Sequence, residues 1–393
     1  MYMLNPVFVW TLLALLAAAS ALAGDKCFNL HKTRTPCDED KTTDGGCVWC
    51  DIVDRPPFCT DMSNAKQWPQ PPAMPPWRCD FPQESGYPIR RLNNGVDMPV
   101  IALGTGGYNN SEAVDAVIKA LQNGLNHVHS AFDYFNLPGV AKGLATKPRE
   151  SIFLTTMTSP CVHLASAPKR NVTDPDECYK LTTRELEESL ELLQVEYVDL
   201  LMLHGPSEPF GYEGGCDGAV CELNKMQWKA YAEFYRNGKA RAIGVSNYCQ
   251  SCLKCLLDST FEDRKPVIVP AVNQIQLHVG MGHDPEGLFS FCSRMGITSQ
   301  AYSPLAAGEV VSDPLCTSLG TKYNKSAAQV GLRWIIQQDF SPALVVKSDK
   351  IKDLESDLDI FSWSLSEDDM TDLSKATTPT GQQDGRPSWG CAE

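Results

Sequence analysis

Residues 127–136, HVHSAFDYFN, carry side chains that could move a proton. His127 and His129 flank one valine, so both point to the same face if this segment is a strand. Tyr134 follows in the same segment. An imidazole exchanges protons near neutral pH, and a phenol can donate a proton to a substrate oxygen. Because one such histidine alone is more often structural than catalytic, the rest of the chain has to decide.

Polar side chains stand at the end of many other short apolar runs. Because the carboxyl ends of parallel barrel strands meet at one rim, repeated polar ends there indicate one shared site. The residues at these run ends are Asp133 and Tyr134, His204, Ser246 and Asn247, Gln274, Tyr302 and Ser303, and Lys347 and Ser348.

The elements that must position these residues begin near Ile89. From there, short and almost wholly apolar runs alternate with amphipathic segments such as EAVDAVIKALQNGL. RELEESLELL is another such segment, and a capping box from Thr182 to Glu185 precedes it. Apolar runs of this kind are typical of parallel strands covered on both faces. The alternation predicts an α/β fold, a (β/α)8 TIM barrel over residues 89–375 with a tail at 376–393.

The first 23 residues carry no charged side chain and end in Ala21-Leu22-Ala23, a signal-peptidase type of site. We predict a cleaved signal peptide at 1–23, with the mature chain starting near Gly24. The alternative is a membrane anchor, but the apolar core is short for a membrane span. After cleavage we expect no membrane association.

Residues 24–80 form a second region, rich in cysteine and poor in aliphatic residues. Such a segment buries little core, so disulfides would have to hold it. Zinc on Cys47 and Cys50 is the alternative, but no second pair with matching spacing follows. GGCVWC resembles the small cysteine-rich modules of the plexin-semaphorin-integrin type, which would offer a surface to a protein partner. The prolines of WPQPPAMPPWRC, residues 68–79, predict a stiff linker.

The whole composition favours the secretory route. The chain has 16 cysteines, and glycan acceptor triplets begin at Asn109, Asn171 and Asn324. A formal net charge of −14 disfavours nucleic acid as a partner. We therefore expect a disulfide-bonded glycoprotein that is secreted or lies in the lumen of the secretory pathway.

Further cysteines fall in the segments that would overhang the barrel mouth. Cys161 and Cys178 could staple one long loop, and disulfides there would restrict its freedom. For the remaining cysteines two interpretations stay open: structural disulfides, or a redox or zinc role for Cys252 and Cys255. Disulfides are favoured in an oxidising compartment. We predict no metal site. These cysteines are Cys216, Cys221, Cys249, Cys252, Cys255, Cys292, Cys316 and Cys391.

The order of the motifs resembles the aldo-keto reductases. The segments that carry the resemblance are LNNGVDMPVIALGTG, HVHSAFDYFN, LLMLHGP, AIGVSNY, AVNQIQLH, AYSPL and VVKS. The resemblance implies an oxidoreductase that uses NADP or NAD to reduce small aldehydes or ketones, without a G-x-G-x-x-G loop.

The resemblance also implies which residues bind the cofactor. Ser246, Asn247 and Gln274 would hold the carboxamide of the nicotinamide, and the Tyr302 ring would stack on its face. Ser303 and Leu305 would contact the pyrophosphate. Lys347 and Ser348 would contact the phosphate on the adenosine ribose.

Two carboxylates depart from the family pattern near that ribose. Asp353 stands where the family has a phosphate-binding arginine, and Asp357 stands where it has an asparagine near adenine. A carboxylate repels a 2′-phosphate but can accept a hydrogen bond from a ribose hydroxyl. NADH is therefore as credible a cofactor as NADPH.

The family's catalytic set of aspartate, tyrosine, lysine and histidine is half retained. Tyr134 and His204 match, whereas His129 takes the aspartate position and Met157 the lysine position. Loss of both members of a buried ion pair avoids leaving one charge unpaired. We expect the fold to survive with weakened reduction, and a protonated His129 would assist Tyr134 below neutral pH. The alternative is a secreted, non-catalytic binding or interaction protein on the same barrel.

Overall fold

The structure is a computed structural model, and it describes most of residues 88–379. The described ranges are 88–163, 169–207, 216, 218–258, 267–340, 342–348 and 350–379, with the strands at 47–52, 55–61 and 77–79. The predicted signal peptide, the prolines of the predicted linker, and Cys391 lie outside these residues. The chain divides into two compact units, Met1–Pro82 and Gln83–Glu393.

In the first unit the described strands form one antiparallel sheet. Strand β1 (Cys47–Ile52) lies between β2 (Arg55–Asp61) and β3 (Trp77–Cys79). In this register Trp49 lies opposite Cys59, and Cys50 lies opposite Cys79. The disulfide and zinc interpretations of this unit concern side chains outside the described part, so both remain predictions.

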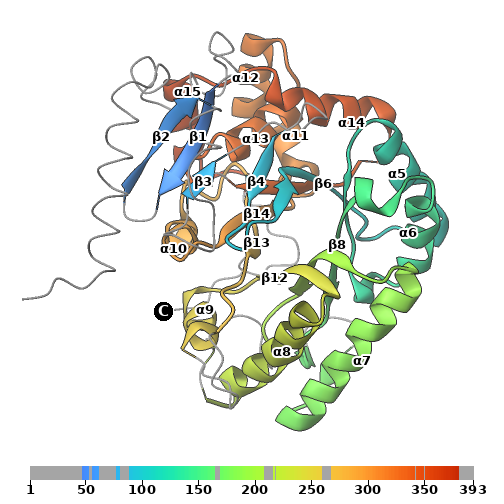
Figure 1. Cartoon of the computed structure of the whole chain (residues 1–393). Coiled ribbons are helices and arrows are strands. Elements are labelled where there is room, and N and C mark those ends of the chain that lie inside the picture. Colours follow the sequence, from blue (N-terminus) through green and yellow to red (C-terminus); the bar gives the residue numbers. More distant parts are fainter. Residues whose placement is uncertain are drawn as a thin grey trace, which may run out of the picture. The chain divides into compact units, whose positions relative to one another are not determined.

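The second unit contains the predicted barrel (Figure 1). Its eight parallel strands close in the order β11-β12-β13-β14-β15-β6-β7-β8. The fold prediction for this region is therefore confirmed. The strands are β6 (Ile101–Gly104), β7 (His127–His129), β8 (Phe153–Thr158), β11 (Val198–Leu203), β12 (Ala240–Ser246), β13 (Val272–Gln276), β14 (Thr298–Tyr302) and β15 (Ala343–Val346).

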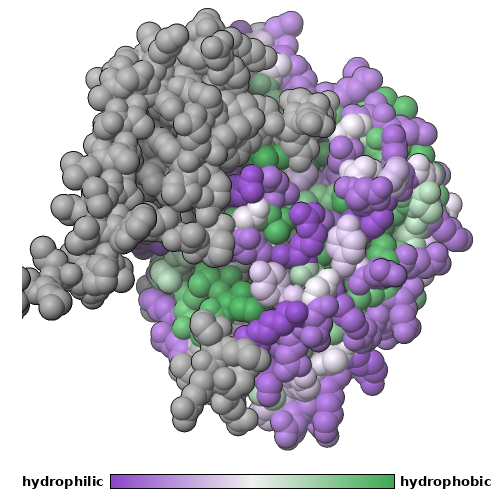
Figure 2. Space-filling model, viewed as in Figure 1, coloured by the Kyte–Doolittle hydropathy of each residue, from purple (hydrophilic) through white to green (hydrophobic). Residues whose placement is uncertain are grey.

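Helices cover the outside of these strands. Their apolar faces and the outward side chains of the strands form one large buried cluster. The helices are α5 (Asn110–Gln122), α6 (Leu137–Leu144), α7 (Pro175–Leu193), α8 (Gly218–Arg236), α9 (Gln250–Leu257), α10 (Leu288–Arg294), α11 (Glu309–Ser312), α12 (Pro314–Tyr323), α13 (Ala327–Ile336), α14 (Ile351–Leu358) and α15 (Glu367–Lys375). In Figure 2 the outer faces on the side of α5 and α7 are mostly hydrophilic, as amphipathic helices require. Among the described residues, no helix has the length and apolar character needed to span a membrane.

A second apolar cluster fills the barrel interior. It includes Met157 of β8, Met202 of β11, and Leu92 and Met98 of the preceding hairpin. This hairpin pairs β4 (Ile89–Arg91) with β5 (Asp97–Pro99). Because its side chains share the interior cluster, the hairpin belongs to the barrel core. The described interior is therefore packed, and the rim formed by the carboxyl ends of the strands is where barrel enzymes place their sites.

Candidate active site

A cavity of ≈ 310 Å³ opens at that rim, and most of the predicted site residues line it. Nine of them lie around this one cavity: His129, Tyr134, His204, Ser246, Asn247, Gln274, Tyr302, Ser303 and Lys347. Gly104, Gly106, Pro304, Val345 and Val346 complete the lining. Residues far apart in the sequence thus meet where the sequence pattern predicted one shared site.

Tyr134 lies in a short 3-10 helix, η1 (Phe132–Tyr134), that follows β7. Its ring packs against the interior cluster that contains Met157. A Cβ at Gly106 would lie 3.2 Å from Tyr134 Cζ and 3.4 Å from its hydroxyl oxygen, so glycine leaves room for the phenol. Burial, and then the charge of Asp133, raise the pKa of Tyr134 well above its usual value. The phenol is therefore protonated and gives up its proton with difficulty.

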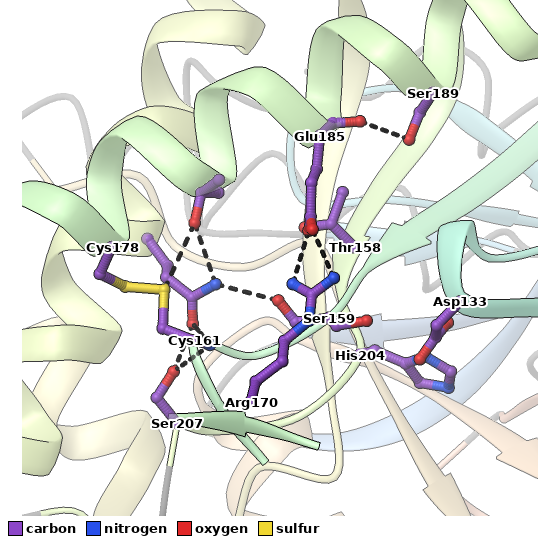
Figure 3. Close-up of polar contacts among 12 residues, drawn as sticks. Asp133, Thr158, Ser159, Cys161, Arg170, Cys178, Glu185, Ser189, His204 and Ser207 are labelled. Atoms are coloured by element: carbon purple, nitrogen blue, oxygen red, sulfur yellow. Dashed lines mark hydrogen bonds and ion pairs between the residues drawn. A yellow bond between two sulfur atoms is a disulfide. The ribbon is translucent and has the colours of Figure 1, made fainter. Parts of the chain in front are cut away.

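His204 follows directly after β11 and has a partner that the sequence reasoning undervalued. Its Nδ1 lies 2.9 Å and 3.0 Å from the two carboxylate oxygens of Asp133 (Figure 3). The His204 ring stands edge-on to Tyr134, with 5.5 Å between ring centres. The 3-10 turn of η1, in place of continued strand geometry, brings Asp133 into contact with His204.

His129 is held as a neutral ring inside the barrel. Burial, and then the neighbouring histidines His127 and His204, lower the pKa of His129 to about 3. Its Nε2 accepts a hydrogen bond from the Gln274 amide nitrogen at 2.9 Å. The expectation that a protonated His129 assists Tyr134 is therefore wrong, because this imidazole stays uncharged until strongly acidic pH.

The second histidine of the opening motif is structural. His127 is fully buried, with Nδ1 3.1 Å from the Pro99 carbonyl and Nε2 2.9 Å from Thr155 Oγ1. It is absent from the cavity lining. Both histidines of the motif point into the barrel, as strand periodicity requires, but only His129 reaches the rim.

Gln274 and Gln300 extend the neutral network around His129. The Gln274 amide nitrogen also donates to Gln300 Oε1 at 2.7 Å. Both N–H groups of Gln274 are thereby used inside the barrel, and its carbonyl oxygen remains to accept a hydrogen bond. Gln300 is a site residue that sequence reasoning missed, and its place inside the strand ITSQAY, facing the same way as Tyr302, was the available signal.

Met157 does not line the cavity. Its side chain is fully buried in the interior cluster, on the strand position next to Met202. A thioether carries no charge, so this position gives Tyr134 an apolar neighbour. The structure thus combines an uncharged residue at 157 with an uncharged ring at 129.

The groups on the far side of the cavity hold one another in place. Asn247 has a left-handed backbone with φ of 58°, which asparagine tolerates better than most residues. Its amide nitrogen donates to the His204 carbonyl at 2.9 Å, and its Oδ1 accepts from the Tyr302 hydroxyl at 2.9 Å. Ser246 Oγ donates to the backbone carbonyl of Gln274 at 2.9 Å. These contacts fix the wall beside His204.

Two of the four residues predicted to meet phosphates line the cavity, and two do not. Ser303 lies in the cavity, but Leu305 does not line it and packs against the core. Lys347 lines the cavity, and its ammonium lies 4.4 Å from the centre of the Tyr108 ring. Ser348 is buried and donates to Asp357 Oδ2 at 2.5 Å. Burial, as the main cause, raises the pKa of Asp357 to about 6.

Disulfides fix the loops that follow β8 and β11. Cys161 pairs with Cys178, Cys216 with Cys252, and Cys221 with Cys255. Cys252 and Cys255 are thus bridging residues in the structure. Cys249 is disulfide-bonded as well, whereas Cys292 and Cys316 are buried thiols.

Polar contacts join the same two loops to one another. Ser207 Oγ accepts from the Cys161 amide at 2.8 Å and donates to Gln227 Oε1 at 2.6 Å. The Arg170 guanidinium forms an ion pair with the buried carboxylate of Glu185 beside them (Figure 3). These contacts tie the described parts of the two loops together on the side of the barrel where His204 follows β11.

The comparisons with known proteins agree with this barrel. Residues 100–377 match the model of the aldo/keto reductase family. The glyoxal reductase of Bacillus subtilis is 33% identical over 283 residues, which cover 71% of this chain and 89% of that protein. Morphine 6-dehydrogenase of Pseudomonas putida is 29% identical over 306 residues, 74% of this chain and 92% of that protein.

A solved structure supports the same conclusion. The aldo/keto reductase of Brucella melitensis is 30% identical, with a TM-score of 0.61, and the match covers 74% of this chain and 99% of that one. The chain belongs to the aldo/keto reductase family.

Proposed function

We propose that this protein reduces the carbonyl group of small aldehydes or ketones with a nicotinamide cofactor. The observation that carries the proposal is that Tyr134, His204, Asn247, Gln274 and Tyr302 line one cavity at the barrel rim. Small dicarbonyl compounds such as glyoxal are the first substrates to test, because glyoxal is named for the Bacillus relative.

The cavity wall suits the amide-bearing ring of a nicotinamide. Gln274 has a carbonyl oxygen left to accept from an amide, and Ser246 and Asn247 place further polar groups beside it. Behind this wall, Gln300 Nε2 is buried without a hydrogen-bond partner among the described residues. Tyr302 offers a flat ring for stacking. When bound, the cofactor supplies the hydride.

The chain's own residues would orient the carbonyl and supply a proton. Tyr134 and His204 face the same cavity from neighbouring positions, edge to ring. His129 and Met157 at the family's aspartate and lysine positions leave Tyr134 without an ammonium helper. We therefore infer slower reduction than in an enzyme with the full set, because positioned acid catalysis is typically worth about 10²- to 10⁴-fold.

We further propose that NADH competes with NADPH for this site. Asp353 is exposed in the first turn of α14, and Asp357 already accepts the hydroxyl of Ser348. Two carboxylates in this region disfavour a 2′-phosphate, and the hydroxyl of Ser348 is engaged with one of them.

We infer that the protein is secreted or lies in the lumen of the secretory pathway. Seven cysteines of the described barrel are in disulfides, which is rare in a reducing cytosol. Asn109, Asn171 and Asn324 of the three glycan acceptor triplets are all exposed. The cysteine-rich unit would offer a surface to a protein partner.

Binding and turnover can be tested separately on the purified full-length protein. Titration with NADPH and with NADH, followed by intrinsic fluorescence, should give saturable binding of at least one of them. Oxidation of the bound cofactor with glyoxal, methylglyoxal and simple aldehydes should then exceed the rate without a carbonyl. Binding without turnover would favour the non-catalytic alternative, and absence of binding would refute the proposal.

A further inference from the structure

Asp133 and His204 form a hydrogen-bonded pair at the cavity. Both carboxylate oxygens lie within 3.0 Å of His204 Nδ1. A carboxylate can only accept, so Nδ1 carries the proton. Nε2 is then the one polar atom of the ring that remains for a substrate, and the ring lines the cavity.

The carboxylate of this pair is ionised. Burial opposes its charge, but the hydrogen bond and the charge of His204 outweigh burial and lower the pKa of Asp133. An imidazolium at 204 would therefore form a pair of zero net charge with Asp133. The other charged or titratable groups nearby are the neutral His129 of β7, Tyr134 of η1, Tyr231 of α8, and Glu185 of α7, which is paired with Arg170.

Tyr134 is poorly placed to lose a proton. The Asp133 carboxylate that favours a cation at His204 disfavours an anion at Tyr134, and burial acts in the same direction. Lys347 is the only lysine or arginine in the described cavity lining, and its ammonium lies against the Tyr108 ring. Apart from Lys347 and a protonated His204, a tyrosinate here would have no cationic partner in the described lining.

We propose that His204, positioned by Asp133, donates the proton to the carbonyl oxygen, while Tyr134 orients that oxygen by a hydrogen bond. This inference rests on the proposed function. As the hydride forms the new C–H bond, the carbonyl π bond breaks, and the oxygen takes the Nε2 proton to form O–H. Two electrons come from the reduced nicotinamide, His204 is left neutral, and Asp133 remains a carboxylate. Solvent returns the proton through Nε2.

The first test is independent of turnover. Two-bond ¹⁵N–¹H correlation spectra of the protein without cofactor identify which nitrogen of a neutral histidine carries the proton, and the His204→Gln variant assigns the signal. We expect His204 to be protonated on Nδ1. Among the histidine signals, that of His204 should change most in the Asp133→Asn variant. A neutral His204 protonated on Nε2 would overturn the proposal.

The second test compares kcat and its pH dependence among variants. Asp133→Asn and His204→Gln should each lower kcat by about 10²-fold, and Asp133→Asn should move the alkaline fall in kcat to lower pH by about one unit. Tyr134→Phe should lower kcat by no more than about tenfold. Asp115→Asn, at an exposed position on α5, serves as the matched control and should leave the profile unchanged.

The outcomes separate this inference from the proposed function. If Tyr134→Phe abolishes turnover and Asp133→Asn keeps the wild-type profile, the inference is wrong and the reductase assignment stands. If the wild-type protein binds cofactor and reduces no carbonyl, the proposed function fails and the assigned proton donor fails with it. Cofactor Kd values within about twofold of wild type would show that the variants act on the chemical step.

Discussion

The Gln274 amide nitrogen lies 2.9 Å from His129 Nε2. This bond joins the residue proposed to stand at the family's aspartate position to a residue of the proposed nicotinamide wall. On that proposal the barrel interior exchanges an ion pair for a neutral hydrogen bond, and Met157 can be apolar without leaving a charge unpaired.

Restoring only one member of the ion pair should destabilise the protein. Met157→Lys or His129→Asp alone places an unpaired charge in the interior, at a cost of about 3–5 kcal/mol in unfolding free energy. The double variant should recover much of that loss and raise kcat for aldehydes at neutral pH. Urea denaturation of the four proteins measures the coupling, and strictly additive losses would contradict the idea that these two positions act as a pair.

Cofactor preference should follow the carboxylates of α14. Asp353→Arg combined with Asp357→Asn should raise the affinity for NADPH relative to NADH by about tenfold, which corresponds to about 1.4 kcal/mol. Fluorescence titration with both cofactors measures the ratio. Asp368→Arg makes the same charge change as Asp353→Arg, at an exposed site on α15, and should leave the ratio unchanged.

Stability should fall as the pH drops below about 6.5. The folded-state pKa values of His127 and His129 are lowered to about 4 and about 3, so the unfolded chain binds more protons than the folded one in this range. Each histidine should lower the unfolding free energy by about 2 kcal/mol as the pH falls from 7 to 5. His129→Gln should reduce the loss by that amount in denaturant titrations, and an unchanged loss would show that His129 already titrates in the fold.

The disulfide between Cys161 and Cys178 should stabilise the loop after β8. It spans a sequence separation of 17, for which loop-closure entropy gives about 3 kcal/mol. Replacing both cysteines with serine should lower the unfolding free energy by about this amount. A loss below 1 kcal/mol would mean that the Ser207 and Gln227 hydrogen bonds already hold the loop.

Much of the fold could be predicted from the sequence, because apolar strand runs and polar strand ends are local signals. Tyr134, His204 and Gln274 were placed correctly at the rim by strand order alone. The Asp133–His204 contact could not be predicted, because it depends on the 3-10 turn of η1. The hydrogen bond from Ser348 to Asp357 could not be predicted, because Asp357 lies on the following helix and helix packing decides which hydroxyl is buried. Disulfide partners such as Cys216 and Cys252 come from different barrel loops, so the sequence leaves many pairings open.

The bond from the Cys161 amide to Ser207 Oγ has a consequence for engineering. It ties together two loops that begin on different strands, so neither can be exchanged as a single insert. A swap that aims at new substrate selectivity has to transplant both segments as one cassette, along with the cysteines that anchor them.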